Sequence, residues 1–182
     1  MADGDLATES DAKRAARLIL AALKRAGIDL VATLPDTWIG DLINEVEHDP
    51  TMTLVRVARE DDGVGVCAGA FLGGRKAALV AQNGGMLLSV NPLAAFAMHH
   101  QIPVLMLLVQ RGNSDDNQYY QVYKGRATVP VLDALSLPYH RVNSVDDYPV
   151  IEEAARQAML ARIPVAVLFS RRAIIGNDKP KG

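Results

Sequence analysis

An acidic run follows a short apolar segment of the sequence and offers the clearest potential for proton chemistry. Glu60, Asp61 and Asp62 stand where a strand is expected to pass into a helix. Acidic residues in the first helical turn offset the helix dipole and satisfy free amides, which is the favoured interpretation for Asp61 and Asp62. Glu60 differs because it falls where the strand would deliver a side chain to the ligand edge of a sheet. The small residues at 64–70 would then let a flat ligand or another backbone approach closely.

Basic side chains lie in or beside a polar segment, residues 110–126. They are Arg111, Lys124 and Arg126, and Asp115 and Asp116 are close in sequence. A solvated loop is the default interpretation of such charges. The alternative is a site for a doubly charged substrate that carries a carboxylate and a sulfonate or phosphonate, because guanidinium groups match planar or tetrahedral oxyanions.

Other reactive side chains are interpreted as structural. His99 and His100 are adjacent, so on a helix they point about 100° apart and cannot chelate a metal together. Cys67 is expected to pack in the interior rather than act as a nucleophile. Trp38 is expected to anchor the core or an interface.

The elements that must position these residues follow from the hydrophobic pattern, which predicts alternating helices and strands. Helices are expected over residues 11–26, 38–46, 60–72, 86–99, 127–135 and from 146 onward, and strands over 28–34, 53–58, 76–81, 103–109, 139–142 and 164–169. Ser10 or Asp11 can cap the first helix, and Gly27 can end it. Pro92 should kink the helix that contains it. Residues 82–85 are expected to form a turn and residues 110–126 a long loop.

The fold class that follows is α/β, an open parallel sheet with helices on both faces. The predicted strands are apolar without alternation, which indicates burial on both sides. In such sheets, ligands bind beyond the carboxyl ends of the strands. One domain is expected over residues 11–175, between flexible tails at 1–10 and 176–182.

Composition and charge exclude several classes of function. The formal net charge is −2 and no long basic stretch is present, so nucleic acid is a poor partner. A single cysteine excludes a disulfide framework, which agrees with a reducing compartment. The longest apolar run, around residues 102–109, is too short for a bilayer. We therefore expect a soluble cytoplasmic protein without membrane contact.

Four stretches resemble the pyrimidine-binding domain of thiamine-diphosphate enzymes, and in particular the sulfopyruvate and phosphonopyruvate decarboxylases. The stretch from Arg59 to Gly74 looks like the segment that carries the activating glutamate. The stretch at 77–85, AALVAQNGG, resembles the following strand and turn. Residues 34–37, LPDT, are similar to a V-P-D-S turn, and residues 121–128 are similar to the loop before a Leu-Asp-Ala-Leu helix, here 132–135. The likeness covers nearly the whole chain after the tail.

The resemblance implies roles for the matching residues. Glu60 would be the catalytic carboxylate that hydrogen-bonds the N1′ nitrogen of the cofactor's aminopyrimidine ring. The cofactor-binding residues would be Pro35, Asp36, Glu60, Gln82, Asn83 and Gly84, and the substrate-binding residues would be Arg111, Lys124 and Arg126. A Gly-Leu-Gly-Asn stretch common in related enzymes is replaced by Met86–Asn91, which puts cofactor contacts from residues 87–90 in doubt.

A second chain is implied as well. Related enzymes hold the diphosphate through Mg²⁺ on a Gly-Asp-Gly…Asn-Asn stretch, which this sequence lacks, so no metal ligand is assigned to it. The resemblance therefore implies an α chain that shares thiamine diphosphate with a β subunit carrying the Mg²⁺ motif, in an α2β2 assembly.

Three functional hypotheses follow. The first is the α subunit of a 2-oxo-acid decarboxylase, nearest to sulfopyruvate decarboxylase, with phosphonopyruvate or another 2-oxo acid as the alternative substrate. The second is a non-catalytic homologue that stabilises a partner, against which the presence of Glu60 counts. The third is a nucleotide-binding domain, against which the absence of a G-x-G-x-x-G turn after the first strand counts.

Overall fold

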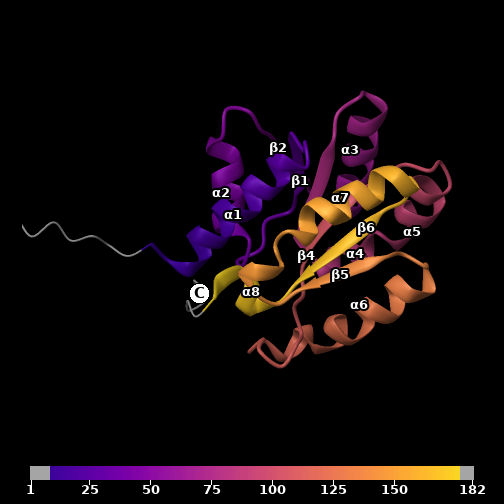
Figure 1. Ribbon diagram of the computed structural model, residues 1–182. Helices are drawn as coiled ribbons and strands as arrows, with labels where there is room; N and C mark the ends of the chain where they lie inside the picture. The colour runs from indigo at the N-terminus through magenta and orange to yellow at the C-terminus, as the bar shows by residue number, and fades with distance from the viewer. Residues whose placement is uncertain (1–8, 177–182) are drawn as a thin grey trace, which may run out of the picture.

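The computed structural model describes residues 9–176, and six parallel strands form one sheet at its centre (Figure 1). The strands are β1 (Leu30–Thr33), β2 (Thr53–Arg56), β3 (Ala77–Gln82), β4 (Leu105–Val109), β5 (Tyr139–Val142) and β6 (Val165–Phe169). Their order in the sheet is β2-β1-β3-β4-β6-β5, and every neighbouring pair is parallel. The predicted open parallel sheet is confirmed.

Helices cover both faces of the sheet, as Figure 1 shows for α7 and α6 on opposite sides of β5 and β6. One face carries α1 (Asp11–Arg25), α2 (Gly40–His48), α7 (Val150–Ala161) and α8 (Arg171–Ile175). The other carries α3 (Glu60–Leu72), α4 (Asn83–Leu88), the π-helix η1 (Leu93–Met98) and α6 (Val122–Ala134). The short α5 (Val90–Pro92) joins α4 to η1, and the 3₁₀ turns η2 (Tyr119–Gln121) and η3 (Val145–Asp147) precede α6 and α7.

Two hydrophobic cores result from the alternation of side chains along the strands. In β3, Ala78 and Val80 join the core under α1 and α7, whereas Leu79 and Ala81 join the core under α3 and η1. All five residues of β4 and of β6 are buried. Burial on both faces explains why the central strands read as continuous apolar runs.

Local signals at the first helix act as predicted. The Ser10 hydroxyl accepts a hydrogen bond from the Lys13 amide and caps α1, so the capping residue comes from the predicted tail. Gly27 has a φ of +76° just after the helix, a conformation that favours glycine. The remaining tail residues, 1–8 and 177–182, lie outside the described part of the chain.

Two predicted connections were wrong. Residues 122–126 belong to α6 rather than to a long loop, and the turn predicted over 82–85 is already helical from Asn83. Gly125 and Pro130 obscure the helix in the sequence because both are poor helix formers. In the structure, the backbone of Gly125 packs closely against that of Gly112. The helix containing Pro92 changes to a π-helix at Leu93, in agreement with the predicted interruption.

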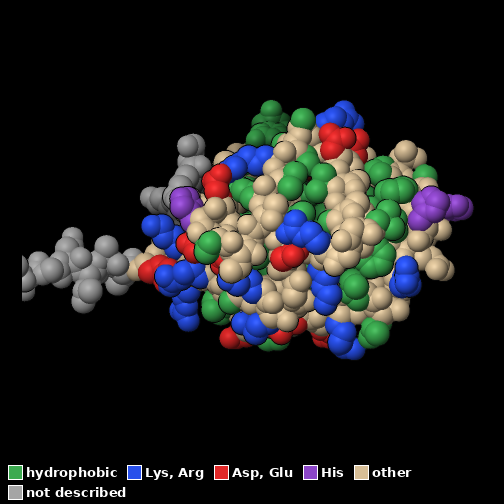
Figure 2. Space-filling model, turned by 90° about the horizontal axis from the view of Figure 1, so that it is seen from above, with side chains coloured by type: hydrophobic (Ala, Val, Ile, Leu, Met, Phe, Trp, Pro, Cys, Tyr) green, Lys and Arg blue, Asp and Glu red, His purple; other side chains and the backbone are tan. Residues whose placement is uncertain are grey.

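The surface seen from above in Figure 2 has basic and acidic side chains interspersed, with hydrophobic side chains between them. Neither sign of charge dominates a large area of that face. Within residues 9–176, no helix has the length and apolar character needed to cross a membrane.

Candidate active site

Several predicted site residues lie together beside β1, where the chain stops adding strands on one side of β1 and continues on the other. The chain runs from β1 outward to β2 and then crosses to β3 on the other side of β1. Ligands of open α/β sheets bind at such a switch point, beyond the carboxyl ends of the strands. The segments that emerge there are 34–37 after β1, Glu60 after β2 and 82–85 after β3.

Glu60 is the first residue of α3 and is only 8% exposed. Among residues 9–176, its carboxylate has no hydrogen-bond or ion-pair partner. Its neighbour Asp61 differs, because it pairs with Arg59 at 2.9 Å and that contact lowers the pKa of Asp61. Asp61 thus has a structural role in the first turn of α3. Glu60, in contrast, has a carboxylate without a partner where the strands end.

Gly85 in α4 packs directly against the Glu60 side chain. A Cβ atom built on Gly85 would lie 2.3 Å from Cγ and 2.7 Å from Cδ of Glu60. No real Cβ contact is that short, so any other residue at position 85 would push the carboxylate away. Gly85 is not among the predicted site residues, although the Gly84-Gly85 pair is a visible signal of close approach in the sequence.

Gln82 and Lys124 meet beside Gly84. A Cβ on Gly84 would lie 3.1 Å from Gln82 Oε1 and 3.2 Å from Lys124 Cδ. The Oε1 atom of Gln82 is buried and has no hydrogen-bond partner within the described residues. A buried polar atom without a partner costs about 1–3 kcal/mol, so this amide is poised for a ligand that supplies a donor.

Asn83 is placed differently from its prediction. It is fully buried, and its side-chain amide donates to the Arg111 carbonyl at 3.1 Å and to Thr128 Oγ1 at 2.8 Å. Its Oδ1 accepts from the Arg111 amide at 3.2 Å. The Asn83 side chain therefore ties segments of the protein together, and its geometry argues against the predicted direct contact with a cofactor.

Arg111 is also buried, with 4% of its side chain exposed. Its guanidinium pairs with Asp36 at 3.1 Å and with Asp116 at 2.9 Å, and it lies 4.1 Å from the centre of the Trp38 ring. Arg111 and Asp36, both predicted to bind ligands, thus bind each other. This geometry argues against direct substrate contact by Arg111, whereas Lys124 is half-buried and Arg126 and Pro35 are exposed.

Two further residues at this edge were missed by the sequence analysis. Asp116 supplies the second carboxylate to Arg111, and burial opposes its ionisation, but Arg111 and the amides of Gly112 and Gln118 lower its pKa below the usual value. Gln121 is 4% exposed, and its Oε1 is a second buried atom without a partner among the described residues. Nothing in the local sequence distinguishes either residue from a solvated loop.

Comparison with known families decides the identity of the fold. The family model described as "Thiamine pyrophosphate enzyme, N-terminal TPP binding domain" matches residues 13–136. The chain belongs to the thiamine pyrophosphate enzymes. The matched region contains Glu60, Gln82, Gly85 and Lys124, so the carboxyl edge described above lies inside the family's cofactor-binding domain.

Relatives within this family are decarboxylases. The chain is 31% identical over 156 residues to the sulfopyruvate decarboxylase subunit alpha of Methanococcus maripaludis, which covers 85% of this chain and 93% of the relative. It is 30% identical over 167 residues to the phosphonopyruvate decarboxylase of Streptomyces viridochromogenes, which covers 89% of this chain but only 41% of the relative.

A solved structure shares the fold. The 2-oxoglutarate:ferredoxin oxidoreductase of Magnetococcus marinus superposes with a TM-score of 0.67 at 17% identity, and the match covers 92% of this chain and 31% of the other. The likeness concerns the arrangement of helices and strands alone.

The carboxyl edge fits the aminopyrimidine half of thiamine diphosphate. An aminopyrimidine needs hydrogen-bond partners for ring nitrogens and an amino group, together with a flat approach. Glu60 presents an uncommitted carboxylate, Gln82 an unpartnered amide oxygen, and Gly84 and Gly85 leave the adjacent backbone without side chains.

Proposed function

We propose that this chain is the α subunit of a thiamine-diphosphate-dependent 2-oxo-acid decarboxylase, with sulfopyruvate as its substrate. The single observation that carries the proposal is Glu60, a residue only 8% exposed that packs on Gly85 inside the family's cofactor-binding domain and has an unpaired carboxylate. Similarity to a sulfopyruvate decarboxylase α subunit over 93% of that subunit supports the choice of substrate.

The chain's own residues would orient and activate the cofactor. Thiamine diphosphate, when bound, supplies the electron sink that allows a 2-oxo acid to lose carbon dioxide. Glu60 would share a proton with N1′ of the aminopyrimidine, and its burial would keep bulk water from competing for that proton. Gln82 Oε1 would accept a hydrogen bond from the ring's amino group, which would satisfy the unpartnered oxygen. Pro35 and Gly84 would border the ring at the ends of β1 and β3.

A partner chain would complete the site. The matched part of the Streptomyces relative is only 41% of its length, so that protein carries a large additional region on the same polypeptide. We propose that a separate β subunit supplies the corresponding region here, and that it binds Mg²⁺ and the diphosphate in an α2β2 assembly. Within residues 9–176, no group of three or more His, Cys, Asp or Glu side chains could hold a metal ion.

Lys124 and Arg126 are the proposed contacts to the substrate's anionic groups. The side chain of Lys124 passes beside Gly84, so its ammonium would reach a substrate bound next to the proposed cofactor site. Arg126 is exposed two residues further along α6. The similarity to a phosphonopyruvate decarboxylase keeps a phosphonate substrate as the alternative.

Calorimetry tests the proposed division of the site. Thiamine diphosphate with Mg²⁺ is titrated into this chain, into a candidate β chain chosen because it carries the diphosphate motif, and into their mixture. The proposal expects tight binding only to the mixture, together with decarboxylation of sulfopyruvate in preference to phosphonopyruvate and pyruvate. Tight binding to this chain alone would contradict the split site, and cofactor binding by the mixture without turnover would favour the non-catalytic alternative.

A further inference from the structure

We propose that Arg111 is a positioning residue, which locks the first turn of α4 against Glu60 and does not bind the substrate. The inference rests on the proposed function of Glu60 but uses contacts that the function does not require. Arg111 lies just after β4, and Gly85, which holds Glu60, lies in α4 after β3. A chain of buried contacts connects the two.

The first link fixes the Arg111 side chain itself. Its Nη1 atom donates to Asp36 at 3.1 Å, and its Nε atom donates to Asp116 at 2.9 Å. The guanidinium also lies over the Trp38 ring, and Trp38 is only 4% exposed. A guanidinium bound on two edges and one face has little freedom left. These contacts join the loop after β1 to the loop after β4, across 75 residues of sequence.

The second link fixes the Arg111 backbone to α4. The Arg111 amide donates to Asn83 Oδ1 at 3.2 Å, and its carbonyl accepts from Asn83 Nδ2 at 3.1 Å. Asn83 is the first residue of α4 and also donates to Thr128 in α6, so its orientation is set by two neighbouring segments. Gly85 follows two residues later in the same helix.

Charge argues against a direct role in substrate binding. Arg111 carries one positive charge, while Asp36 and Asp116 present two carboxylates to it. A dianionic substrate placed here would meet an excess of negative charge rather than a free cation. The side chains of all three residues are at most 8% exposed, so an entering anion would also have to displace packed groups.

Hydrogen exchange on the full chain tests the proposal without any activity measurement. Amide exchange is followed by mass spectrometry over residues 82–88 in the wild type, Arg111→Met, Arg111→Lys and Asn83→Ala. Asp36→Asn replaces Arg111→Met if the latter does not fold. The matched control is Arg56→Met, which removes an exposed pair with Glu47. Emission from Trp38, the only tryptophan, reports the Arg111 contact in the same samples.

The two links give separable results. Arg111→Met should change Trp38 emission and speed exchange over 82–88 by about tenfold, a typical effect of losing one net hydrogen bond. Asn83→Ala should speed the same exchange but leave Trp38 emission as in the wild type. Arg111→Lys should fall between the wild type and Arg111→Met, because one ammonium cannot hold both carboxylates. If exchange over 82–88 were unchanged in Arg111→Met, Arg111 would stabilise only its own surroundings and not α4, and the proposal would be overturned.

A kinetic split adds a second readout in the reconstituted complex. A positioning role predicts that Arg111→Lys lowers kcat about tenfold or more while KM for the 2-oxo acid changes less than about threefold. A direct substrate contact predicts a large rise in KM, which would overturn the proposal. If the proposed decarboxylase function were wrong, the wild type would show no turnover. The hydrogen-exchange result would still test the positioning role of Arg111, because it does not depend on activity.

Discussion

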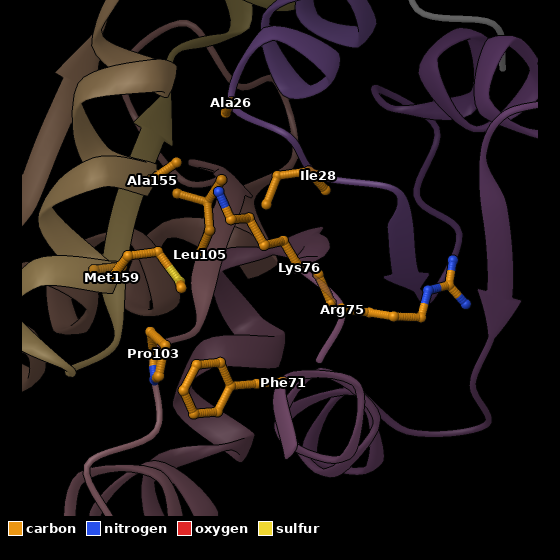
Figure 3. Close-up of a pocket in the computed structure, with 11 residues that line it drawn as sticks. Ala26, Ile28, Phe71, Arg75, Lys76, Pro103, Leu105, Ala155 and Met159 are labelled. Atoms are coloured by element: carbon orange, nitrogen blue, oxygen red, sulfur yellow. The ribbon is translucent and has the colours of Figure 1, made fainter. Parts of the chain in front are cut away.

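The amino and carboxyl ends of the parallel strands form two edges of the sheet. These edges differ in whether their polar side-chain atoms have hydrogen-bond partners. At the amino edge, where the strands begin, a narrow hollow of about 20 Å³ has mostly apolar walls that include Phe71, Pro103 and Met159 (Figure 3). Lys76 crosses this hollow, whereas Arg75 turns away to pair with Asp29. At the carboxyl edge, where the strands end, Gln82 buries an amide oxygen without a partner among the described residues, and Glu60 is only 8% exposed. Polar side-chain groups without partners therefore distinguish the candidate active site from the amino edge.

The largest effect is expected from removing the negative charge of Glu60 at the carboxyl edge. Glu60→Gln keeps the shape of the side chain but removes its ability to share a proton with a ring nitrogen. We expect kcat of the reconstituted complex to fall by about 10²–10⁴-fold, the usual contribution of a positioned acid–base group. Steady-state kinetics measures the effect. Asp61→Asn is the matched control and should keep most of the activity; near-normal turnover by Glu60→Gln would remove Glu60 from its proposed role.

Gly85→Ala should act through the same carboxylate without changing its chemistry. The new Cβ would meet Glu60 Cγ at 2.3 Å, so the carboxylate must move. We expect kcat to fall by about 10²-fold, since displacement of about 1 Å has that effect on a catalytic group. Gly69→Ala in α3 is the control, because a Cβ there meets nothing within 4 Å; it should stabilise the helix by about 0.5–1 kcal/mol. Equal activity of the two variants would contradict the packing argument.

The pH dependence of unfolding should distinguish the buried ion pairs of the carboxyl edge from exposed ones. The pKa of Asp116 is lowered in the folded chain, so its stabilisation is complete above its unfolded pKa of about 3.9 and is lost as the pH falls through the folded value. Asp116→Asn should lower the free energy of unfolding at neutral pH by about 3 kcal/mol and flatten this acid dependence. Urea titrations between acidic and neutral pH measure both effects.

Glu47→Gln is the control for that titration, because Glu47 forms an exposed pair with Arg56. Its effect should stay below about 1 kcal/mol and fade with added salt, which screens exposed charges. An acid dependence of Asp116→Asn that matches the wild type would assign the lost stability to other carboxylates.

A substitution at the amino edge should have little effect on activity or stability in the same assays. Lys76→Met removes the charge from the hollow but keeps a long apolar stem. We expect kcat and KM to change by less than about twofold and stability by less than about 0.5 kcal/mol, as for most partly exposed substitutions. A loss of activity comparable to Gly85→Ala would show that the two edges are coupled and would remove the distinction drawn between them.

Much of the fold could be predicted because it depends on local signals. The buried strands read as apolar runs, and Ser10 and Gly27 bound the first helix at the predicted positions. The part of α6 at 122–126 could not be predicted, because a close backbone crossing supports it. A Cβ on Gly112 would lie 2.1 Å from the Gln121 carbonyl oxygen, and one on Gly125 would lie 2.6 Å from the Gly112 carbonyl oxygen.

The candidate site was predicted in part for a similar reason. Glu60, Gln82 and Gly84 follow directly from their places at strand ends, and the structure gathers them. Arg111 looked like an anion-binding residue because its partner Asp36 lies 75 positions away in the sequence. Two oppositely charged residues that neutralise each other in space are indistinguishable, in the sequence, from two ligand contacts.

Cys67 has a practical consequence for mapping the partner. It is the only cysteine in the chain, it is buried, and burial raises the pKa of its thiol to about 12. At neutral pH it therefore stays protonated and inaccessible to alkylating reagents. A cysteine introduced at Leu160, which is 73% exposed, or at Tyr119, which is 86% exposed, would be the one thiol to accept a fluorescent or spin label. The natural chain is thus ready for distance measurements without first having its own cysteine replaced.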